Sequence, residues 1–190
     1  MAIVLASASP RRRQLLEMLG VKELRILPAR SEEKAPGVTD PAALVKALSA
    51  AKAREVALRC RAEDVVIGAD TVVWLDDRVF GKPKTPDEAA EMLRTLSGRT
   101  HEVYTGVTIL AGGMEYSEAE RSAVRFRALS EREIAAYVAS GEPMDKAGAY
   151  GAQDKAALFV EGIDGDFFNV MGLPLCRLGQ MLHKLGVELL

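Results

Sequence analysis

The stretch VVIGADTVVWL, residues 65–75, determines how the rest of the chain is interpreted. Its apolar run, which ends at the turn-forming pair Asp76-Asp77, predicts a buried strand. Asp70 lies within that run, where an isolated carboxylate would be costly, so it must be paired, metal-bound or raised in pKa. Such carboxylates are often catalytic. The alternative is an Asx-type turn at a kink of the strand.

Helices and strands alternate on both sides of this stretch. Residues 2–5 predict a strand, and the next helix should start at Ser9 and Pro10, because serine is a good N-cap and proline suits the first turn. Capping residues and apolar spacing predict further helices that begin at Asp40, Thr85, Ser130 and about Pro174. Further strands are expected at 103–110, 123–128, 158–160 and 167–171. This order predicts one mixed α/β domain over residues 1–190.

Composition narrows the class of protein. A chain of 190 residues with 48% apolar and 27% charged residues is typical of a globular domain that needs no disulfides or structural metal. Its net charge of -2 gives no field for a polyanion, so nucleic acid is not an expected partner. Cys60 and Cys176 sit in apolar helical patterns typical of buried thiols and fit a reducing cytoplasm. We expect neither a signal peptide nor a membrane helix, and hence no membrane partner.

The segment SASPRRR, residues 7–13, is the first candidate site. A strand there delivers backbone N–H groups to a helix N-terminus beside hydroxyl and guanidinium groups, and phosphate binds such places. Basic residues in a first turn oppose the helix dipole by about 0.3–1 kcal/mol each, so three arginines favour a bound anion over a stabilising role. The alternative is an ordinary Ser-Pro cap beside a solvated arginine face.

Two lysines and two adjacent glutamates are weaker candidates. Lys52 shares one face of its expected helix with apolar residues, and snorkelling of its ammonium group is the alternative explanation. Lys82 follows a strand, in a loop where solvation is the usual reason for a lysine. Glu32 and Glu33 occupy an irregular segment. Such pairs usually face solvent, yet carboxylate oxygens also suit Mg²⁺.

The glycine-rich segment 145–154 lets the backbone approach a flat ligand, and Gln153 offers both a donor and an acceptor to the edge of a base. A plain mobile loop is the alternative. The sequence lacks a Walker P-loop, a dinucleotide-binding glycine motif and a serine nucleophile elbow. His101 and His183 are isolated, which disfavours a histidine triad or a zinc site, so both should be surface or satisfied polar residues.

Taken in order, several short motifs resemble those of the Maf family of nucleoside triphosphate pyrophosphatases. The resemblance spans nearly the whole chain, and the joint order of the motifs is specific. It implies an elongated mixed sheet flanked by helices, similar to the inosine triphosphate pyrophosphatase fold, with a cleft for a nucleotide. The motifs are LASASPRR at 5–12, Glu33, AKA at 51–53, GADTVV at 68–73, GKP at 81–83, LSG at 96–98, DKAGAYG at 145–151 and GLP at 172–174.

The resemblance also implies a reaction and a set of roles. A nucleoside triphosphate would be hydrolysed between its α and β phosphates to a monophosphate and pyrophosphate, with Mg²⁺ or Mn²⁺ as cofactor. Asp70 would be the general base that activates water, and Glu33 with Asp70 would be the acids near the metal. Many members have Asp-Glu where this chain has two glutamates, so Glu32 stays an alternative ligand. The residues that would hold the triphosphate are Ser9, Arg11, Arg12, Lys52 and Lys82.

Within the family, a subgroup with dTTP and UTP as substrates is most similar, because Thr71 follows Asp70 and DKAGAYG leads into Gln153. Arg11, Thr71 and Gln153 are then the specificity positions. Two alternatives stay open: a pyrophosphatase for 7-methyl-GTP or other modified purine nucleotides, and a non-catalytic nucleotide-sensing regulator of cell division. The expected partner is the nucleotide substrate, and a homodimer is compatible with the sequence.

Overall fold

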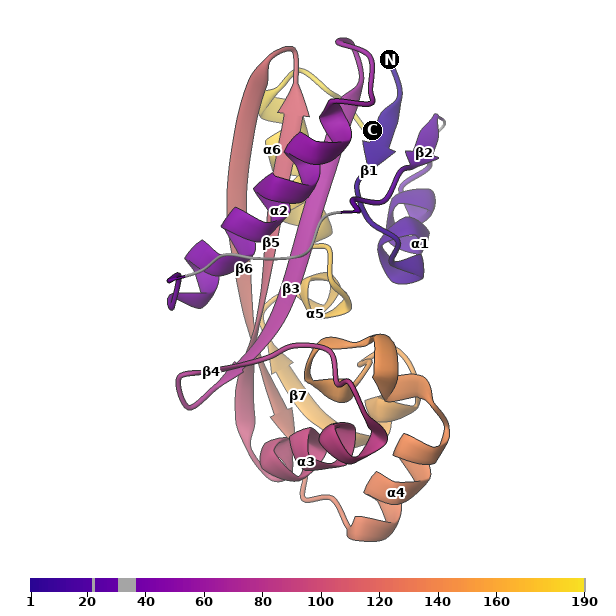
Figure 1. The fold of residues 1–190 in the computed structure, drawn as a ribbon, viewed down its shortest axis with the longest axis vertical. Helices are drawn as coiled ribbons and strands as arrows, with labels where there is room; N and C mark the ends of the chain where they lie inside the picture. The colour runs from indigo at the N-terminus through magenta and orange to yellow at the C-terminus, as the bar shows by residue number, and fades with distance from the viewer. Residues whose placement is uncertain (22, 31–36, 190) are drawn as a thin grey trace. The chain divides into compact units, whose positions relative to one another are not determined.

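The computed structural model describes residues 1–21, 23–30 and 37–189. The chain forms two compact units. Unit 1 holds the described parts of residues 1–70, 105–120 and 172–190, and unit 2 holds residues 71–104 and 121–171. Three long strands contribute residues to both units: β3 (Val65–Leu75), β5 (Thr100–Ala111) and β6 (Met114–Phe126) (Figure 1).

The strands form one mixed sheet with the order β2-β1-β3-β5-β6-β7, and β4 pairs with β3. β1 (Ile3–Leu5) runs parallel to β2 (Leu24–Ile26) and to β3. β4 (Arg78–Phe80) and β7 (Val160–Asp164) are antiparallel to β3 and β6 respectively. The predicted mixed sheet with flanking helices is therefore confirmed. β2 and β4 are three-residue strands that the sequence pattern did not predict.

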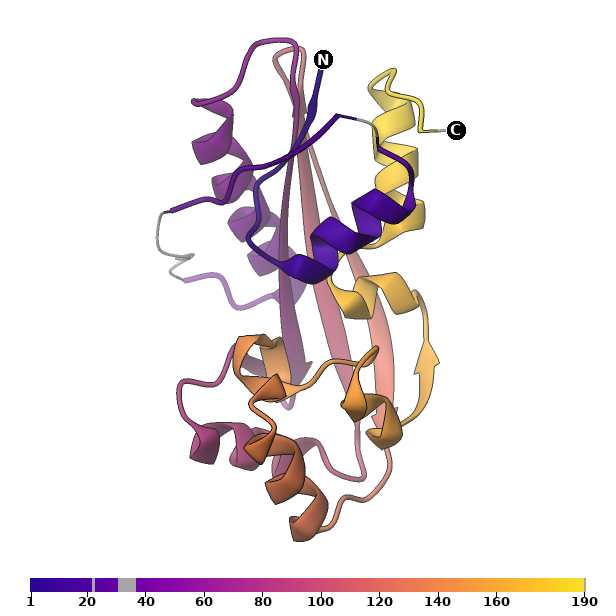
Figure 2. The ribbon, with the colours of Figure 1, turned by 90° about the vertical axis from the view of Figure 1, so that its right-hand side faces the viewer.

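Helices cover both faces of the strands in unit 1. Figure 2 shows α2 (Pro41–Ala57) on one side of these strands, and α1 (Pro10–Met18) and α6 (Leu175–Lys184) on the other. α2 buries Val45, Val56 and Ala53, and the last two of these pack with residues of β1 and β3. Apolar burial of this kind, rather than intrinsic propensity, holds such helices in place.

Unit 2 is built around aromatic side chains. The rings of Phe126 and Tyr150 meet edge to face at 4.7 Å, and those of Tyr137 and Phe159 at 5.2 Å. Edge-to-face ring contacts stabilise a fold beyond what the burial of the apolar ring surface contributes. The helical segments of the unit are α3 (Pro86–Leu96), α4 (Glu131–Ala139), α5 (Phe167–Met171) and the 3-10 helices η1 (Glu142–Asp145), η2 (Ala147–Ala149) and η3 (Lys155–Phe159).

The predicted helix starts are confirmed at several N-caps. In each, the side-chain oxygen of the cap accepts a hydrogen bond from a backbone N–H three residues later, which satisfies a donor that the helix itself leaves unpaired. Ser130 and Glu133 also form the complete capping box. The caps are Ser9, Asp40, Thr85 and Ser130.

The prediction of a strand at 167–171 is wrong, because these residues form helix α5. The Asp166 carboxylate accepts a hydrogen bond from the Phe168 N–H at 2.7 Å, and so caps a helix that the apolar run conceals. The strand expected at 158–160 starts only at Val160, since the residues before it form η3. Cys176 is exposed, contrary to the burial that its apolar pattern indicated.

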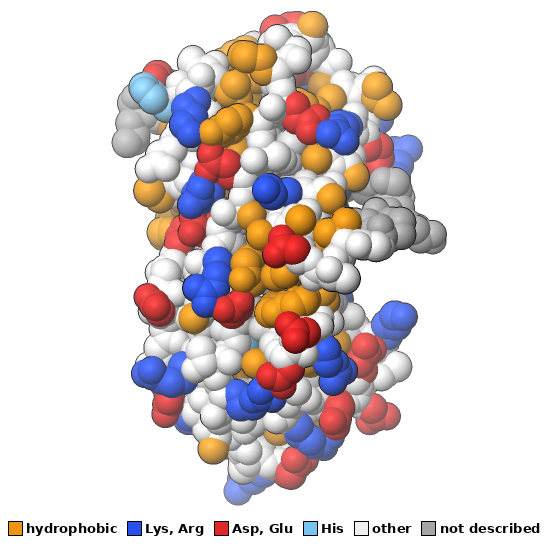
Figure 3. Space-filling view, turned by 90° about the vertical axis from the view of Figure 1, so that its left-hand side faces the viewer, with side chains coloured by type: hydrophobic (Ala, Val, Ile, Leu, Met, Phe, Trp, Pro, Cys, Tyr) orange, Lys and Arg blue, Asp and Glu red, His pale blue; other side chains and the backbone are white. Residues whose placement is uncertain are grey.

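The surface carries charges of both signs. On the face that Figure 3 shows, acidic and basic side chains are interspersed. Oppositely charged side chains also form ion pairs, such as Arg54–Glu115 and Arg177–Glu120. Among the described residues, none of the helices combines the length and the apolar character that crossing a membrane requires.

Candidate functional site

The Asp70 carboxylate on β3 is paired with the Lys52 ammonium on α2. The Nζ–Oδ1 distance is 2.5 Å, and the two side chains are only 12% and 7% exposed. Pairing was one of the states that burial allowed for Asp70, and the structure shows that state. Lys52 does not snorkel to solvent, since its ammonium group is turned toward the carboxylate. Unit 1 therefore contains a buried, charged acid–base pair.

Gly68 lets α2 approach β3 closely enough to form this pair. A Cβ atom at Gly68 would lie 2.2 Å from the Ser49 carbonyl oxygen and 2.9 Å from the Ala53 backbone nitrogen. Both contacts are backbone atoms of α2, so a side chain here would push the helix outward. Ser49 and Ala53 lie on either side of Lys52 in the sequence. The glycine therefore sets the distance between the helix that carries Lys52 and the strand that carries Asp70.

Arg12 is fixed at the N-terminus of α1. Its side chain donates from Nε to the Gly172 carbonyl at 2.7 Å and from Nη1 to the Ser7 hydroxyl at 3.1 Å. Ser7 Oγ also accepts a hydrogen bond from the Ser9 N–H at 3.2 Å. Arg12 is 9% exposed, so the solvated-face explanation is wrong for this arginine. A guanidinium held at a helix N-terminus beside two hydroxyl groups is suited to an anion.

Two of these groups were not singled out by sequence reasoning. Ser7 was read only as part of the motif at 7–13, and Gly172 only as part of the motif at 172–174. Both accept hydrogen bonds from the Arg12 side chain, and the Arg12–Gly172 contact joins residues 160 positions apart. No local pattern predicts such a pairing.

Arg11 lies on α1 in unit 1 and is half-buried, and the remaining predicted residues lie in unit 2 or outside the described chain. Thr71 follows Asp70 and is half-buried, and Lys82 is exposed in the loop between β4 and α3. The loop of Lys82 is tied to η2, because the Gly148 N–H donates to the Gly81 carbonyl at 3.0 Å. Glu32 and Glu33 lie outside the described residues, and so the structure does not place them.

The segment 145–154, for which a plain loop was the alternative, contains a short helical turn and specific side-chain contacts. Gly148 and Ala149 lie in η2, and Tyr150 points its hydroxyl to His101 Nε2 at 2.7 Å. Gln153 is half-buried and donates from Nε2 to the Asp154 carboxylate at 3.1 Å. The Tyr150 hydroxyl therefore ties the middle of the segment to β5, whereas the Gln153–Asp154 bond is local to the segment.

His101 was expected to be a surface or satisfied polar residue, and it is buried. Burial lowers its pKa to about 4, so the imidazole is neutral near pH 7 and supplies no charge to a phosphate. Its Nε2 is satisfied by Tyr150, whereas Nδ1 makes no hydrogen bond with the described residues. The exposed His183 pairs with Glu188 at 2.7 Å. The described polar partners of the two histidines are thus Tyr150 and Glu188, and neither pairs with Asp70 or Lys52.

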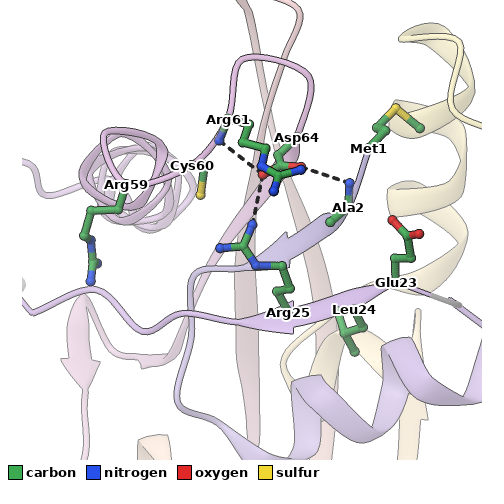
Figure 4. Close-up of a pocket in the computed structure, with 9 residues that line it drawn as sticks. All are labelled: Met1, Ala2, Glu23, Leu24, Arg25, Arg59, Cys60, Arg61 and Asp64. Atoms are coloured by element: carbon green, nitrogen blue, oxygen red, sulfur yellow. Dashed lines mark hydrogen bonds and ion pairs between the residues drawn. The ribbon is translucent and has the colours of Figure 1, made fainter.

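A pocket of about 580 Å³ opens in unit 1, and none of the predicted site residues lines it (Figure 4). The Asp64 carboxylate at its centre accepts hydrogen bonds from the backbone N–H groups of Ala2 at 3.0 Å and Arg61 at 3.2 Å, and from the Arg25 guanidinium at 3.0 Å. The two backbone donors lower the pKa of Asp64, the Ala2 N–H most strongly. These bonds fasten the start of β1 to the residue before β3, which is a structural role.

The next feature is the grouping of potential metal ligands in the part of the chain that the structure describes. No group of three or more His, Cys, Asp or Glu residues gathers there. The Asp70 carboxylate supplies the hard oxygen atoms that Mg²⁺ and Mn²⁺ prefer. The chemistry of this donor fits such an ion.

Known proteins resemble this chain over almost its full length. A dTTP/UTP pyrophosphatase of Moorella thermoacetica is 52% identical over 188 residues, which cover 98% of this chain and 96% of that protein. A dTTP/UTP pyrophosphatase of Pelotomaculum thermopropionicum is 50% identical over 190 residues, which cover 99% and 98% of the two chains.

Among solved structures, a HAM1 protein of Coxiella burnetii superimposes with a TM-score of 0.52, at 17% identity, over 97% of this chain and 100% of that chain. At this identity the likeness shows the fold alone. The family model described as Maf-like protein matches residues 2–185. Its extent agrees with the two relatives above and with the motifs between residues 5 and 174. The chain therefore belongs to the Maf-like protein family.

Proposed function

We propose that this chain is a nucleoside triphosphate pyrophosphatase that hydrolyses dTTP and UTP to the monophosphate and pyrophosphate. The buried Asp70–Lys52 pair is the observation that carries this proposal, because it holds a proton acceptor beside a cation in one unit. Relatives that are 52% and 50% identical over nearly the full length are named dTTP/UTP pyrophosphatases, which supports the substrate class.

Asp70 acts as the general base in this proposal. Its carboxylate takes a proton from water while the water oxygen attacks the α phosphorus. The bond from phosphorus to the bridging oxygen breaks, and pyrophosphate leaves with that oxygen. A positioned base of this kind contributes about 10²–10⁴-fold to the rate. Asp70 needs no covalent partner, because phosphoanhydride hydrolysis depends mainly on positioning and charge neutralisation.

Cationic side chains hold the triphosphate. Arg12 is already oriented by Ser7 and Gly172, which reduces the entropy lost when phosphate binds. Lys52 supplies a point charge beside the base. The further residues assigned to the triphosphate are Ser9, Arg11 and Lys82, and those assigned to the base of the nucleotide are Arg11, Thr71 and Gln153.

A divalent cation, Mg²⁺ or Mn²⁺, completes the proposal. Asp70 and Glu33 would hold the ion, with Glu32 as the alternative to Glu33. The ion would neutralise charge that builds up on the phosphate oxygens. Two carboxylates suit this choice of metal better than they suit zinc, whose sites are rich in His and Cys.

We also propose that the chain is one functional domain that works in the cytoplasm. Its cysteines, Cys60 and Cys176, are both unpaired in the structure, as a reducing compartment favours. Nucleic acid and membranes are not partners in this proposal, because the charge of -2 gives no basic surface field. The partner is the nucleotide, and a second copy of the chain is compatible with it.

The test is a panel of dTTP, UTP, CTP, GTP, ATP and 7-methyl-GTP, each with Mg²⁺ or Mn²⁺, with pyrophosphate release as the readout. We expect the highest kcat/KM for dTTP and UTP, and activity that chelation of the metal abolishes. A maximum on 7-methyl-GTP would identify a purine enzyme instead. Tight nucleotide binding without any turnover would identify a sensor.

A further inference from the structure

The contact between Gln153 and Asp154 allows one orientation of the Gln153 side-chain amide. Its neighbour at 3.1 Å is the Asp154 Oδ2 atom, and an ionised carboxylate only accepts hydrogen bonds. The nitrogen of the amide, Nε2, must therefore face Asp154. The carbonyl oxygen lies on the opposite branch of the amide, as an acceptor directed away from Asp154.

Asp154 is held in place by a buried lysine. The Lys146 Nζ atom lies 3.8 Å from Asp154 Oδ2, and the Lys146 side chain is 8% exposed. Lys146 is anchored in turn, because Nζ donates to the Glu142 carbonyl at 2.7 Å and to Asp145 Oδ1 at 2.8 Å. These two charge-assisted hydrogen bonds hold the ammonium group in the position from which it faces Asp154.

The backbone is shaped to bring these groups together. A Cβ atom at Gly151 would lie 2.6 Å from Lys146 Cε and 2.8 Å from Asp154 Oδ2, so the glycine leaves the space that the two side chains occupy. The Asp154 side chain does not cap η3, although it precedes that helix. Its described polar partners are Gln153 and Lys146.

We propose that Asp154 and Lys146 are positioning residues that determine which pyrimidine is accepted, by turning the Gln153 carbonyl oxygen toward the base. This inference rests on the proposed function. Uracil and thymine carry an N3–H donor, which a carbonyl oxygen satisfies. Cytosine has an unprotonated N3 at the same place, which only accepts hydrogen bonds. Its lone pair would face a lone pair of the Gln153 carbonyl oxygen, and no hydrogen bond would form. Recognition by one fixed acceptor therefore favours UTP and dTTP over CTP.

The test compares the ratio of kcat/KM for UTP to that for CTP in the wild type and in Asp154→Asn. An asparagine amide both donates and accepts, so it no longer dictates the orientation of Gln153. We expect the ratio to fall about tenfold, as for one mismatched polar contact. Asp164→Asn, an exposed aspartate on β7, is the matched control and should leave the ratio unchanged.

A double-mutant comparison separates orientation of Gln153 from a general structural effect. In a Gln153→Ala background, Asp154→Asn should leave the ratio unchanged, because there is no amide left to orient. The same fall in both backgrounds would overturn the inference. Lys146→Met should lower the ratio in the same direction, with Tm measured to confirm folding.

The outcomes also separate this inference from the proposed function. A wild-type enzyme without preference for UTP over CTP would overturn the proposed substrates and the inference together. A clear wild-type preference that Asp154→Asn leaves intact would overturn the inference alone.

Discussion

Asp64 lies just before β3 and Asp70 lies within it, six residues later. Both are buried carboxylates with a cationic partner. Asp64 accepts from two backbone N–H groups and from Arg25, whereas Asp70 pairs with the lysine side chain of Lys52. Backbone donors fix a carboxylate as part of the fold. A lysine is a flexible point charge that can exchange one anion for another. Burial alone therefore does not separate a structural carboxylate from a functional one. The partners of the carboxylate are needed to make that distinction.

The sharpest way to test this contrast is Asp70→Asn. The amide keeps the shape of the carboxylate but accepts no proton from water, so turnover should fall by about 10²-fold or more. Single-turnover hydrolysis of dTTP, on protein whose fold is checked by circular dichroism, measures the loss. Retention of more than about a tenth of the wild-type rate would show that Asp70 is not the base.

Lys52→Ala should have the next largest effect. It removes a cation from the triphosphate site and leaves the Asp70 carboxylate without this counter-charge, so we expect kcat/KM to fall by roughly 10- to 100-fold. Lys46→Ala, an exposed lysine on the same helix, is the control and should behave as the wild type. If the two variants had equal kinetics, Lys52 would have only a packing role.

Asp64→Asn should have the smallest effect on activity and a clear effect on stability. We expect kcat/KM within about twofold of the wild type and a decrease in Tm of about 5 °C, because the hydrogen bonds to the charged group weaken. The pKa of Asp64 is lowered in the folded state, so its stabilisation is present above the ordinary pKa of an aspartate and is lost as pH falls through the lowered value.

Thermal unfolding at a series of pH values measures this dependence. The difference in Tm between wild type and Asp64→Asn should be constant near pH 7 and shrink in acid. A difference that grows as pH falls would contradict the assignment of Asp64 as a paired anion in the folded state.

Local chemistry explains what was predictable. The helix starts at Ser9 and Ser130 follow from contacts over three residues, and they were predicted correctly. Asp70 and Lys52 each stood out against an apolar background, but their contact depends on the approach of α2 to β3 across Gly68. Sequence spacing of 18 residues carries no information about that approach.

Other features had no local pattern to reveal them. Residues 167–171 were wrongly predicted as a strand, because five apolar-rich residues fit either structure and the decisive Asp166 lies just before them. Asp154 was given no role of its own, since that role depends on the direction of the Gln153 amide. Glu33 stays a prediction that rests on the family resemblance.

The pairing of β3 with β1 also constrains chain length. Ile3, Val4 and Leu5 pair with Val65, Val66 and Ile67 in fixed register, which holds the strand between Asp64 and Asp70 in place. Side chains alternate between the two faces of a strand, so one inserted or deleted residue at 65–69 would turn Asp70 away from Lys52. Insertions and deletions between relatives are therefore expected at the turn at Asp76-Asp77. A change in length there leaves the number of residues between Asp64 and Asp70 unchanged.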